Sequence, residues 1–326
     1  MPRAFITGIS GQDGSYLAEL LLEKGCEVHS LVRRSQVHHR NLAHLLDDPA
    51  IHGRRLFLHE GDVANVALLR GVLADIAPDE VYHLAGQTHV GLSFEMAEAT
   101  CELIAMGTLR LLEIIRTLPR PPRFFHASSS EIFGRPDSSP QDEQTPMRPI
   151  NPYGCAKAFA TQMVSIYRQR FGLFACNGIL YNHESPRRGE NFVTRKICLG
   201  AAAIKAGRQT HLNLGNTSAR RDWGDARDYV RGMWLMMQQS AAQDFVLATG
   251  ELHSVQEVAE LAFGALGLDW KAHVVSDPAL IRPDETFSLV GKSLKAQRLL
   301  NWQPKGGFSD LIVEMTLAAA ESKRAG

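Results

Sequence analysis

The amino-acid sequence predicts an α/β protein built on a doubly wound parallel sheet, with a smaller and mostly helical second unit. Two observations carry this prediction. Up to Leu180, short apolar runs alternate with longer helical patterns, which is typical of βαβ units. After Leu180 this alternation stops, and the polar segment Tyr181–Glu190, rich in Arg, Gly and Pro, marks the start of a different region.

The first region should supply the strands and helices of the sheet unit. Its strands are short β-rich runs, and its helices carry apolar residues at three- and four-residue spacing. The expected strands are Ala4–Thr7, Val28–Val32, Leu56–His59, Val81–Leu84, Phe124–Ala127 and Phe174–Leu180. The expected helices are Ser15–Lys24, Val66–Ile76, Cys101–Thr117 and Tyr153–Phe171.

The second region is mostly helical. A helix is expected from Phe192 to about Gly207, and Ser254 with Glu257 forms a capping box at the start of another. One more buried strand, Asp244–Thr249, returns the chain to the sheet, and an amphipathic helix ends it. We therefore expect residues 1–180 and about 226–251 to form the sheet unit, and about 181–225 and 252–326 to form the second unit.

Composition excludes several classes of protein. With 35 basic and 35 acidic side chains the formal charge is zero, so no global field favours nucleic acid or anionic lipid. The five cysteines are odd in number and lie in apolar stretches, which indicates reduced thiols and a cytoplasmic protein. No apolar run approaches the roughly 18 residues of a membrane span. We expect a soluble protein without a bound metal.

A glycine-rich loop, Gly8–Gly14, follows the first expected strand and opens into a helix. Glycines permit a tight turn and close backbone approach, and a helix N-terminus presents N–H groups to a pyrophosphate. The loop therefore predicts a dinucleotide-binding (Rossmann) site. Taken alone, the same spacing also fits an ordinary strand-to-helix turn.

The second strand ends in Arg33 and Arg34, where an NAD-binding protein would place an acid for the ribose 2′-hydroxyl. Two guanidinium groups suit a 2′-phosphate, so the pattern favours NADP, although the pair could also be a solvated basic turn. Asp62, after the third strand, is a candidate acceptor for the adenine amino group.

Tyr153 and Lys157 stand four residues apart at the start of an expected helix, so both lie on one face. An ammonium close to a phenol lowers its pKa and makes it a usable base, and Lys157 can also hold a cofactor ribose. A chance surface pair is the alternative, because Y-x-x-x-K is a short motif.

Three serines and a glutamate, Ser128–Glu131, follow the fifth strand. They should lie at the carboxyl edge of the sheet, where open α/β folds bind ligands. A hydroxyl there can bond to a reacting sugar oxygen, and Glu131 supplies a carboxylate that a dehydratase needs and a simple ketone reductase does not. The alternative is an ordinary polar turn at the end of the strand, with no functional role.

Five longer motifs make the sequence resemble the GDP-mannose 4,6-dehydratases, a family of extended short-chain dehydrogenases/reductases. The similarity covers nearly the whole chain. The motifs are Thr7–Leu17, Tyr181–Gly189, Phe192–Lys196, Arg221–Gly224 and Ala248–Glu251.

The resemblance implies roles for particular residues. Ser129 would fill the catalytic threonine position with help from Ser130, Glu131 would be the base, and Tyr153 and Lys157 the redox pair. NADP would contact Gly8, Ile9, Ser10, Gly11, Gln12, Asp13, Arg33, Arg34, Ser35, Gln36, Asp62, Val63, Leu84, Ala85, Gly86, Gln87, Thr88, Lys157, His183 and Arg188. The nucleotide-sugar would be held by Asn182, Val193, Lys196, Arg221, Arg282 and Glu285, with the guanine nearest Val193 and Lys196.

Several of these residues have simpler roles open to them. Arg221 and Arg282 could instead pair with the neighbouring Asp222 and Asp284, and His183 could be a satisfied loop histidine.

The chain also departs from the family pattern. Phe287 and Lys292 stand where the family has aspartate, which leaves the base and the sugar open. The loop Gln36–Arg40 is unusual, and in the family it reaches a neighbouring subunit. We therefore expect a homodimer and leave a tetramer open.

The resemblance implies conversion of GDP-mannose to GDP-4-keto-6-deoxymannose by internal hydride transfer through bound NADP. A related nucleotide-sugar epimerase or uronate decarboxylase stays open, because decarboxylases of this superfamily share S-x-S-E and Y-x-x-x-K. A third alternative is a catalytically inactive NADP-sensing protein that regulates a partner, although such proteins usually lack the Tyr and Lys. The pathway and any downstream reductase or epimerase are not specified.

Overall fold

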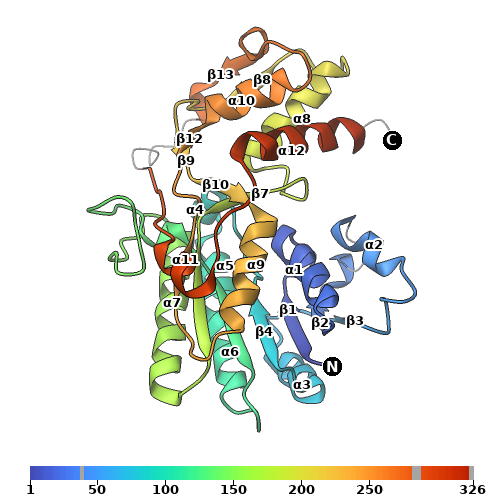
Figure 1. The fold of residues 1–326 in the computed structure, drawn as a ribbon, viewed down its shortest axis with the longest axis vertical. Helices are drawn as coiled ribbons and strands as arrows, with labels where there is room; N and C mark the ends of the chain where they lie inside the picture. The colour runs from blue at the N-terminus through green and yellow to red at the C-terminus, as the bar shows by residue number, and fades with distance from the viewer. Residues whose placement is uncertain (37–39, 281–287, 323–326) are drawn as a thin grey trace.

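A seven-stranded parallel sheet forms the centre of the molecule, as the sequence predicted. The computed structural model describes residues 1–36, 40–280 and 288–322. The strand order is β11-β6-β5-β4-β1-β2-β3, in which the chain starts in the middle, winds to one edge, and then returns to build the other (Figure 1). The strands are β1 (Arg3–Thr7), β2 (Glu27–Val32), β3 (Leu56–Glu60), β4 (Glu80–His83), β5 (Arg123–Ser129), β6 (Ala175–Leu180) and β11 (Phe245–Leu247).

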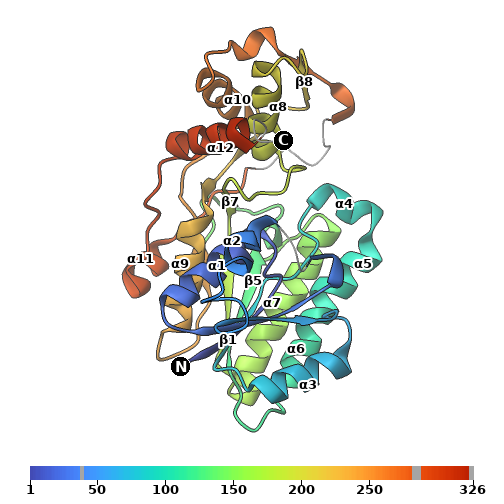
Figure 2. The same ribbon diagram turned by 90° about the vertical axis from the view of Figure 1, so that its right-hand side faces the viewer.

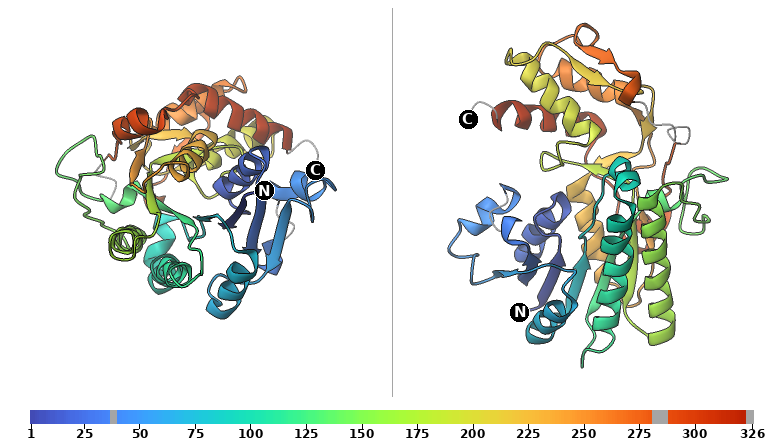
Figure 3. Two further views of the ribbon diagram at one scale, coloured as in Figure 1. Left: turned by 60° about the horizontal axis from the view of Figure 1, so that its bottom comes forward. Right: turned by 180° about the vertical axis from the view of Figure 1, so that it is seen from behind.

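Helices cover both faces of this sheet (Figures 2 and 3). One face is packed by α3 (Val66–Ile76), α6 (Gly107–Ile115) and α7 (Pro152–Phe171), through a core that includes Leu73, Leu111 and Val164. The other face is packed by α1 (Gln12–Glu23) and α9 (Ala226–Met237). Every strand pairs in parallel, and βαβ crossovers require this two-sided cover.

The expected helix Cys101–Thr117 is longer and less regular than its pattern indicated. It is approached through α4 (Val90–Glu95), begins as α5 (Ala97–Cys101), passes through a π-helical turn at Glu102–Met106 and continues as α6. Short elements α2 (Ala43–Leu46) and 3₁₀ turns at Arg34–Gln36 and Arg40–Leu42 lie between β2 and β3, and a 3₁₀ turn η4 (Ser130–Ile132) follows β5.

A second unit sits above the carboxyl ends of the strands (Figure 1). Its core joins α8 (Val193–Lys205), α10 (Val255–Gly264) and α12 (Phe308–Ser322). The expected capping box is present, since Ser254 and Glu257 each bond to the other's backbone N–H. Small two-stranded sheets complete the unit: β7 (Asn182–Glu184) with β10 (Trp223–Asp225), β9 (Arg220–Arg221) with β12 (His253–Ser254), and β8 (Leu212–Leu214) with β13 (Val274–Ser276).

Near the end of the chain, one segment of the expected second unit packs against the sheet unit. The helix α11 (Leu294–Leu300) packs on β11 and α9, and Leu289, Ala296 and Trp302 belong to the core of the sheet unit. Trp302 is fully buried, and its indole N–H donates to the carbonyl of Asp228 at 2.8 Å. We therefore propose that residues 289–302 belong with the sheet unit and that the second unit resumes at α12. Among the helices of the described ranges, none is long and apolar enough to cross a membrane.

Candidate active site

Two adjoining cavities open at the carboxyl ends of the strands. The smaller, of about 290 Å³, is lined by the loop after β1 and by the ends of β2, β3 and β4. Of the expected cofactor residues it contains Gly8, Ile9, Ser10, Gly11, Gln12, Asp13, Arg33, Asp62, Val63, Leu84, Ala85, Gly86, Thr88 and Arg188. Arg34, Ser35, Gln36 and Gln87 do not line it.

The glycine loop has the close backbone approach that a dinucleotide cradle requires. A Cβ on Gly8 would lie 2.9 Å from the amide nitrogen of Ala85, and φ there is +79°. A Cβ on Gly14 would lie 2.3 Å from the Gly8 carbonyl oxygen. No side chain caps the N-terminus of α1 at Gly11, so the helix presents its first amides to the cavity. The loop therefore fits a pyrophosphate.

The larger cavity, of about 740 Å³, lies between the sheet unit and the second unit. It brings together all the expected catalytic side chains with four of the expected substrate residues. These are Ser129, Ser130, Glu131, Tyr153 and Lys157, with Asn182, Val193, Lys196 and Arg221. His183 also lines this cavity. Asp13, Leu84, Thr88 and Arg188 line both cavities, so the two share a wall.

Ser129 stands at the end of β5 and Tyr153 in the first turn of α7, and both line the larger cavity. Burial raises the pKa of the Tyr153 phenol to about 12, against the opposing effects of the nearby Ser129 hydroxyl and of the Arg188 charge. This corrects our expectation that the pKa of the phenol is lowered: the Lys157 ammonium lies 5.9 Å from the ring centroid, and the effect of burial prevails.

Lys157 is almost fully buried beneath the cavity. Its Nζ donates to the carbonyl of Ala127 at 2.5 Å, and burial lowers its pKa to about 8. Ser128, which the sequence grouped with the other serines, faces α7 instead: its Oγ lies 2.6 Å from Oγ1 of Thr161. Thr161 Oγ1 in turn donates to the Lys157 carbonyl at 2.8 Å. Ser128 is therefore part of the support for Lys157.

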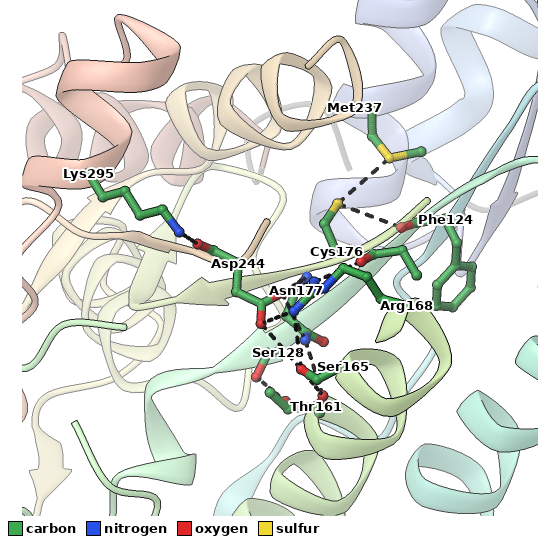
Figure 4. A network of polar contacts seen from close by, with 11 residues as sticks. Phe124, Ser128, Thr161, Ser165, Arg168, Cys176, Asn177, Met237, Asp244 and Lys295 are labelled. Atoms are coloured by element: carbon green, nitrogen blue, oxygen red, sulfur yellow. Dashed lines mark hydrogen bonds and ion pairs between the residues drawn. The ribbon is translucent and has the colours of Figure 1, made fainter. Parts of the chain in front are cut away.

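A polar network fixes the other half of α7 to the sheet (Figure 4). Arg168 binds both carboxylate oxygens of Asp244, at 2.7 and 2.9 Å. The same carboxylate accepts from the backbone and side chain of Asn177, whose Nδ2 also donates to the Thr161 carbonyl at 3.1 Å. These contacts join α7, β6 and the residue before β11. They therefore fix the position of the helix that carries Tyr153 and Lys157 against the sheet.

Glu131 has a partner that the sequence argument did not find. Nδ2 of Asn151 donates to Glu131 Oε2 at 2.8 Å, and Asn151 lines the same cavity. The sequence signal was present, because an Asn before Pro at a helix start is a typical N-cap. Its contact with a residue twenty positions earlier could not be read from the helix pattern.

The glycine loop is joined to the second unit through Gln12 and Asp13. Nε2 of His183 lies 2.9 Å from Asp13 Oδ2, and its Nδ1 lies 2.7 Å from the Tyr181 carbonyl. Gln12 donates to the His183 carbonyl at 3.0 Å and accepts from Ser185 at 2.7 Å. The His183 ring also stacks on Tyr229, with centroids 4.5 Å apart.

Asp222 ties together three segments at the wall of the larger cavity. Its buried carboxylate accepts from the Thr249 amide and hydroxyl, at 3.0 and 2.6 Å, and from the amides of Gly250 and Gly291, at 3.0 and 3.2 Å. Its role is thus to hold backbone segments, and Arg221 lies beside it in the cavity lining.

The nucleotide end of the cavity is only partly described. Lys196 donates from Nζ to the Asn213 carbonyl at 2.8 Å. Arg282, Glu285 and Phe287 lie outside the described residues, as does most of the expected loop after Gln36. Phe192, Leu92 and Phe94 add an apolar rim to the same cavity that the sequence argument did not anticipate.

Comparison with known proteins places the whole chain among one group of enzymes. A family model described as GDP-mannose 4,6 dehydratase matches residues 5–315. GDP-mannose 4,6 dehydratase 1 of Arabidopsis thaliana is 50% identical over 318 residues, covering 96% of this chain and 88% of that protein. The Homo sapiens enzyme is 45% identical over 342 residues, covering 98% and 92%. The Vibrio cholerae enzyme is 44% identical over 345 residues, covering 97% and 93%.

Solved structures show the same fold. A dTDP-glucose 4,6-dehydratase from Streptomyces venezuelae, with NAD and TYD bound, superposes with a TM-score of 0.86 at 24% identity, covering 99% of this chain and 98% of that one. A UDP-glucose 4-epimerase from Thermotoga maritima, with UDP-glucose, superposes with a TM-score of 0.83 at 21% identity, covering 99% and 100%.

Proposed function

The chain belongs to the GDP-mannose 4,6-dehydratase family, and from this premise we propose how its own residues convert GDP-mannose to GDP-4-keto-6-deoxymannose. The activity is that of a hydro-lyase working with a nicotinamide cofactor. Family membership separates the chain from the epimerases and uronate decarboxylases that share its shorter motifs. The observation that carries the assignment of residues is the gathering of Ser129, Glu131 and Tyr153 in one cavity that adjoins the glycine-lined cavity.

The cofactor we assign is NADP. The smaller cavity offers Gly8–Asp13 for the pyrophosphate, Asp62 for the adenine and Leu84–Thr88 for the rest of the dinucleotide. Arg33 lines the cavity at the end of β2, with Arg34 next to it, and these guanidinium groups supply the charge that a 2′-phosphate needs. When bound, the nicotinamide supplies reversible two-electron chemistry to the sugar.

Tyr153 and Ser129 act on the sugar 4-hydroxyl in this proposal. Tyr153 takes the hydroxyl proton as C4 is oxidised to the ketone, while Ser129 bonds to the same oxygen. The raised pKa makes the ionised phenol a strong base but keeps it protonated near neutral pH. A positive charge must therefore favour the phenolate during turnover, and Lys157 and Arg188 are the cations that this chain places around it.

Glu131 carries out the dehydration. A ketone at C4 acidifies the hydrogen on C5, so a carboxylate can remove it as a proton. The electron pair of the C5–H bond forms a double bond to C6, the C6–O bond breaks, and the leaving hydroxide takes a proton from Glu131 or through Ser129 to become water. The hydride removed from C4 would then return to C6 while C5 takes up a proton, which gives the 4-keto-6-deoxy product with no net redox change, so added NADPH is not consumed.

Mass analysis of a single incubation tests this function. Purified protein with GDP-mannose and no added reductant should give a product lighter by one water. Parallel incubations with UDP-, CDP- and dTDP-sugars test the base, because Phe287 and Lys292 stand where the family has aspartate. Recovery of unchanged GDP-mannose beside a dehydrated sugar on another base would refute the proposed substrate.

We also propose a homodimer formed through the outer face of α7. Phe159 and Ile166 lie seven residues apart on this helix and are 41% and 47% exposed, and Phe171 at its end is 48% exposed. Side chains this apolar are typical of a protein interface. Light scattering should give the dimer mass, and Phe159→Glu with Ile166→Glu should give a monomer that keeps its far-UV circular dichroism. A monomeric wild type would contradict the proposal.

A further inference from the structure

We propose that Asn151 is a positioning residue that orients the carboxylate of Glu131 for dehydration; this rests on the proposed function of Glu131. Asn151 is 6% exposed and lies in the cavity lining. Its Oδ1 accepts from the amide of Gly154 at 2.7 Å, and its Nδ2 donates to Glu131 Oε2 at 2.8 Å. One side-chain amide therefore contacts both the helix start and the base.

The orientation of this amide is fixed by its partners. The backbone amide of Gly154 can only donate, so the atom facing it must be the oxygen of Asn151. The NH₂ group is then the atom that faces Glu131, and a flipped side chain would set a donor against a donor. The contact with Glu131 is thus a hydrogen bond from Asn151 to a carboxylate oxygen.

The same residue sets the position of Tyr153 and Lys157 relative to Glu131. Asn151 is the N-cap of α7, which carries both of them. The first turn of α7 lies directly against η4, since a Cβ on Gly154 would stand 2.5 Å from the Glu131 carbonyl oxygen. On the other side, Ser129 Oγ accepts from the Glu131 amide at 3.2 Å. The phenol, the hydroxyl and the carboxylate are therefore held by contacts that meet at residues 129–131 and 151–154.

This contact assigns different tasks to the two oxygens of Glu131. Oε2 faces the N–H donor of Asn151, so it cannot carry a proton towards that neighbour without losing the bond. Oε1 is therefore the oxygen that takes the C5 proton and gives it to the leaving hydroxyl. Without Asn151 the carboxylate could rotate and hold the proton on either oxygen.

Asn151 does not ionise, so a substitution can change the pH profile only through the charged groups around it. Besides Glu131 itself, the titratable and charged residues that line the same cavity come from α1, α4, α7, α8, β7, β9 and the segments around them: Asp13, His89, Glu95, Tyr153, Lys157, Tyr181, His183, Glu184, Arg188, Lys196 and Arg221.

Two substitutions separate positioning from helix capping. Asn, Asp and Ser are all good N-caps, so Asn151→Asp and Asn151→Ser both keep the bond to Gly154. Asn151→Asp sets a second carboxylate against Glu131, and two adjacent carboxylates retain a shared proton to higher pH. Asn151→Ser is too short to reach Glu131. Asn65→Asp, at the cap of α3, is the matched control, because Asn65 Oδ1 accepts from the Leu68 amide at 3.1 Å and no carboxylate among the described residues bonds to its side chain.

The measurement is kcat and KM for water loss from GDP-mannose between pH 5 and 9, with the melting temperature of each variant. We expect Asn151→Asp to move the acid limb of kcat up by about one pH unit or more, as adjacent carboxylates do. We expect Asn151→Ser to lower kcat by about tenfold with little change in KM, as loss of a hydrogen bond to a charged group does. Asn65→Asp should leave the profile unchanged.

The inference is overturned if both Asn151 variants keep the wild-type acid limb and kcat. It is also overturned if kcat falls only in step with the melting temperature, because Asn151 would then act as a helix cap alone. These outcomes differ from failure of the proposed function, in which the wild type itself does not dehydrate GDP-mannose or Glu131→Gln remains active.

Discussion

His183 Nε2 lies 2.9 Å from Asp13 Oδ2, while its Nδ1 lies 2.7 Å from the Tyr181 carbonyl oxygen. Both ring nitrogens thus face acceptors, which the doubly protonated imidazolium satisfies and the neutral ring does not. Burial lowers the pKa of His183, but the charge and hydrogen bond of Asp13 outweigh it, and the pKa is raised overall. Burial raises the pKa of Asp13, but His183 lowers it further in return. The pair joins the glycine loop to β7.

The Asp13–His183 pair should make stability depend on pH. Because the folded pKa of His183 is raised, its contribution is complete below about pH 6.5 and is lost as pH rises through the folded value. Because the folded pKa of Asp13 is lowered, its contribution to stability is present above about pH 3.8 and is lost as pH falls through the folded value. The melting temperature of Asp13→Asn should therefore fall furthest below wild type between these limits. A gap that stays constant from pH 5 to 9 would contradict this.

The buried ammonium group of Lys157 should lower the free energy of unfolding. Burial lowers its pKa from 10.5 to about 8, which corresponds to about 3 kcal/mol at neutral pH. The cost is present below pH 8 and is relieved as pH rises towards the unfolded value. Lys157→Met should therefore raise the unfolding free energy at pH 7 by up to that amount and abolish dehydration, with the gain shrinking above pH 8. Urea unfolding from pH 6 to 9 measures it. The exposed Lys205→Met is the control, and an equal or lower stability at pH 7 would refute the cost.

Replacing Asp222 should loosen the wall of the substrate cavity. Asp222→Asn puts an NH₂ group where two backbone amides, those of Gly250 and Gly291, now donate. We expect the free energy of unfolding to fall by about 2–4 kcal/mol, as for other buried polar groups left unpaired. We also expect a higher KM, because the preceding residue, Arg221, lines the cavity. Asp48→Asn, whose amide oxygen can still accept from the Ala50 amide, should change stability by less than about 0.5 kcal/mol. Similar values for both variants would show that the Asp222 contacts are dispensable.

Arg33 should decide between the two nicotinamide dinucleotides. Removing its charge from the cavity takes away a partner of the 2′-phosphate and leaves the rest of the cradle intact. Arg33→Ser should weaken NADP binding by about tenfold, the effect of one charge-assisted hydrogen bond, and leave NAD binding unchanged. Calorimetric titration of both dinucleotides measures this, with the exposed Arg54→Ser as control. Equal losses for NADP and NAD would remove the basis for assigning NADP.

Much of the fold was predictable because its elements obey simple periods. The strands of the sheet are buried apolar runs. At its carboxyl end β5 runs past the predicted Ala127, because Ser128 and Ser129 continue the pairing with β6 as far as Leu180. Val66–Ile76 was predicted to the residue. The short strands of the second unit, such as β8 and β13, carry no period and were missed. The amphipathic α9 was also missed, although Asp225 caps it.

The site was predictable in its residue types but not in its contacts. The end of β5 and the start of α7 each carried a motif, so Ser129, Glu131 and Tyr153 could be named from sequence. Their hydrogen bonds could not be predicted, because the hydrophobic period of one helix or strand does not show which element packs against it. Asp13 and His183 are 170 residues apart, and the raised pKa of Tyr153 follows from burial that only the packed structure shows.

The most direct test of the mechanism is Glu131→Gln, which keeps the shape of the side chain and removes its ability to accept a proton. The variant, with Glu23→Gln at the exposed end of α1 as control, should be given GDP-mannose and assayed by mass for loss of water. We predict that Glu131→Gln binds cofactor and GDP-mannose with wild-type affinity and forms no dehydrated product, whereas the control is fully active. Dehydration by Glu131→Gln at the wild-type rate would contradict the account.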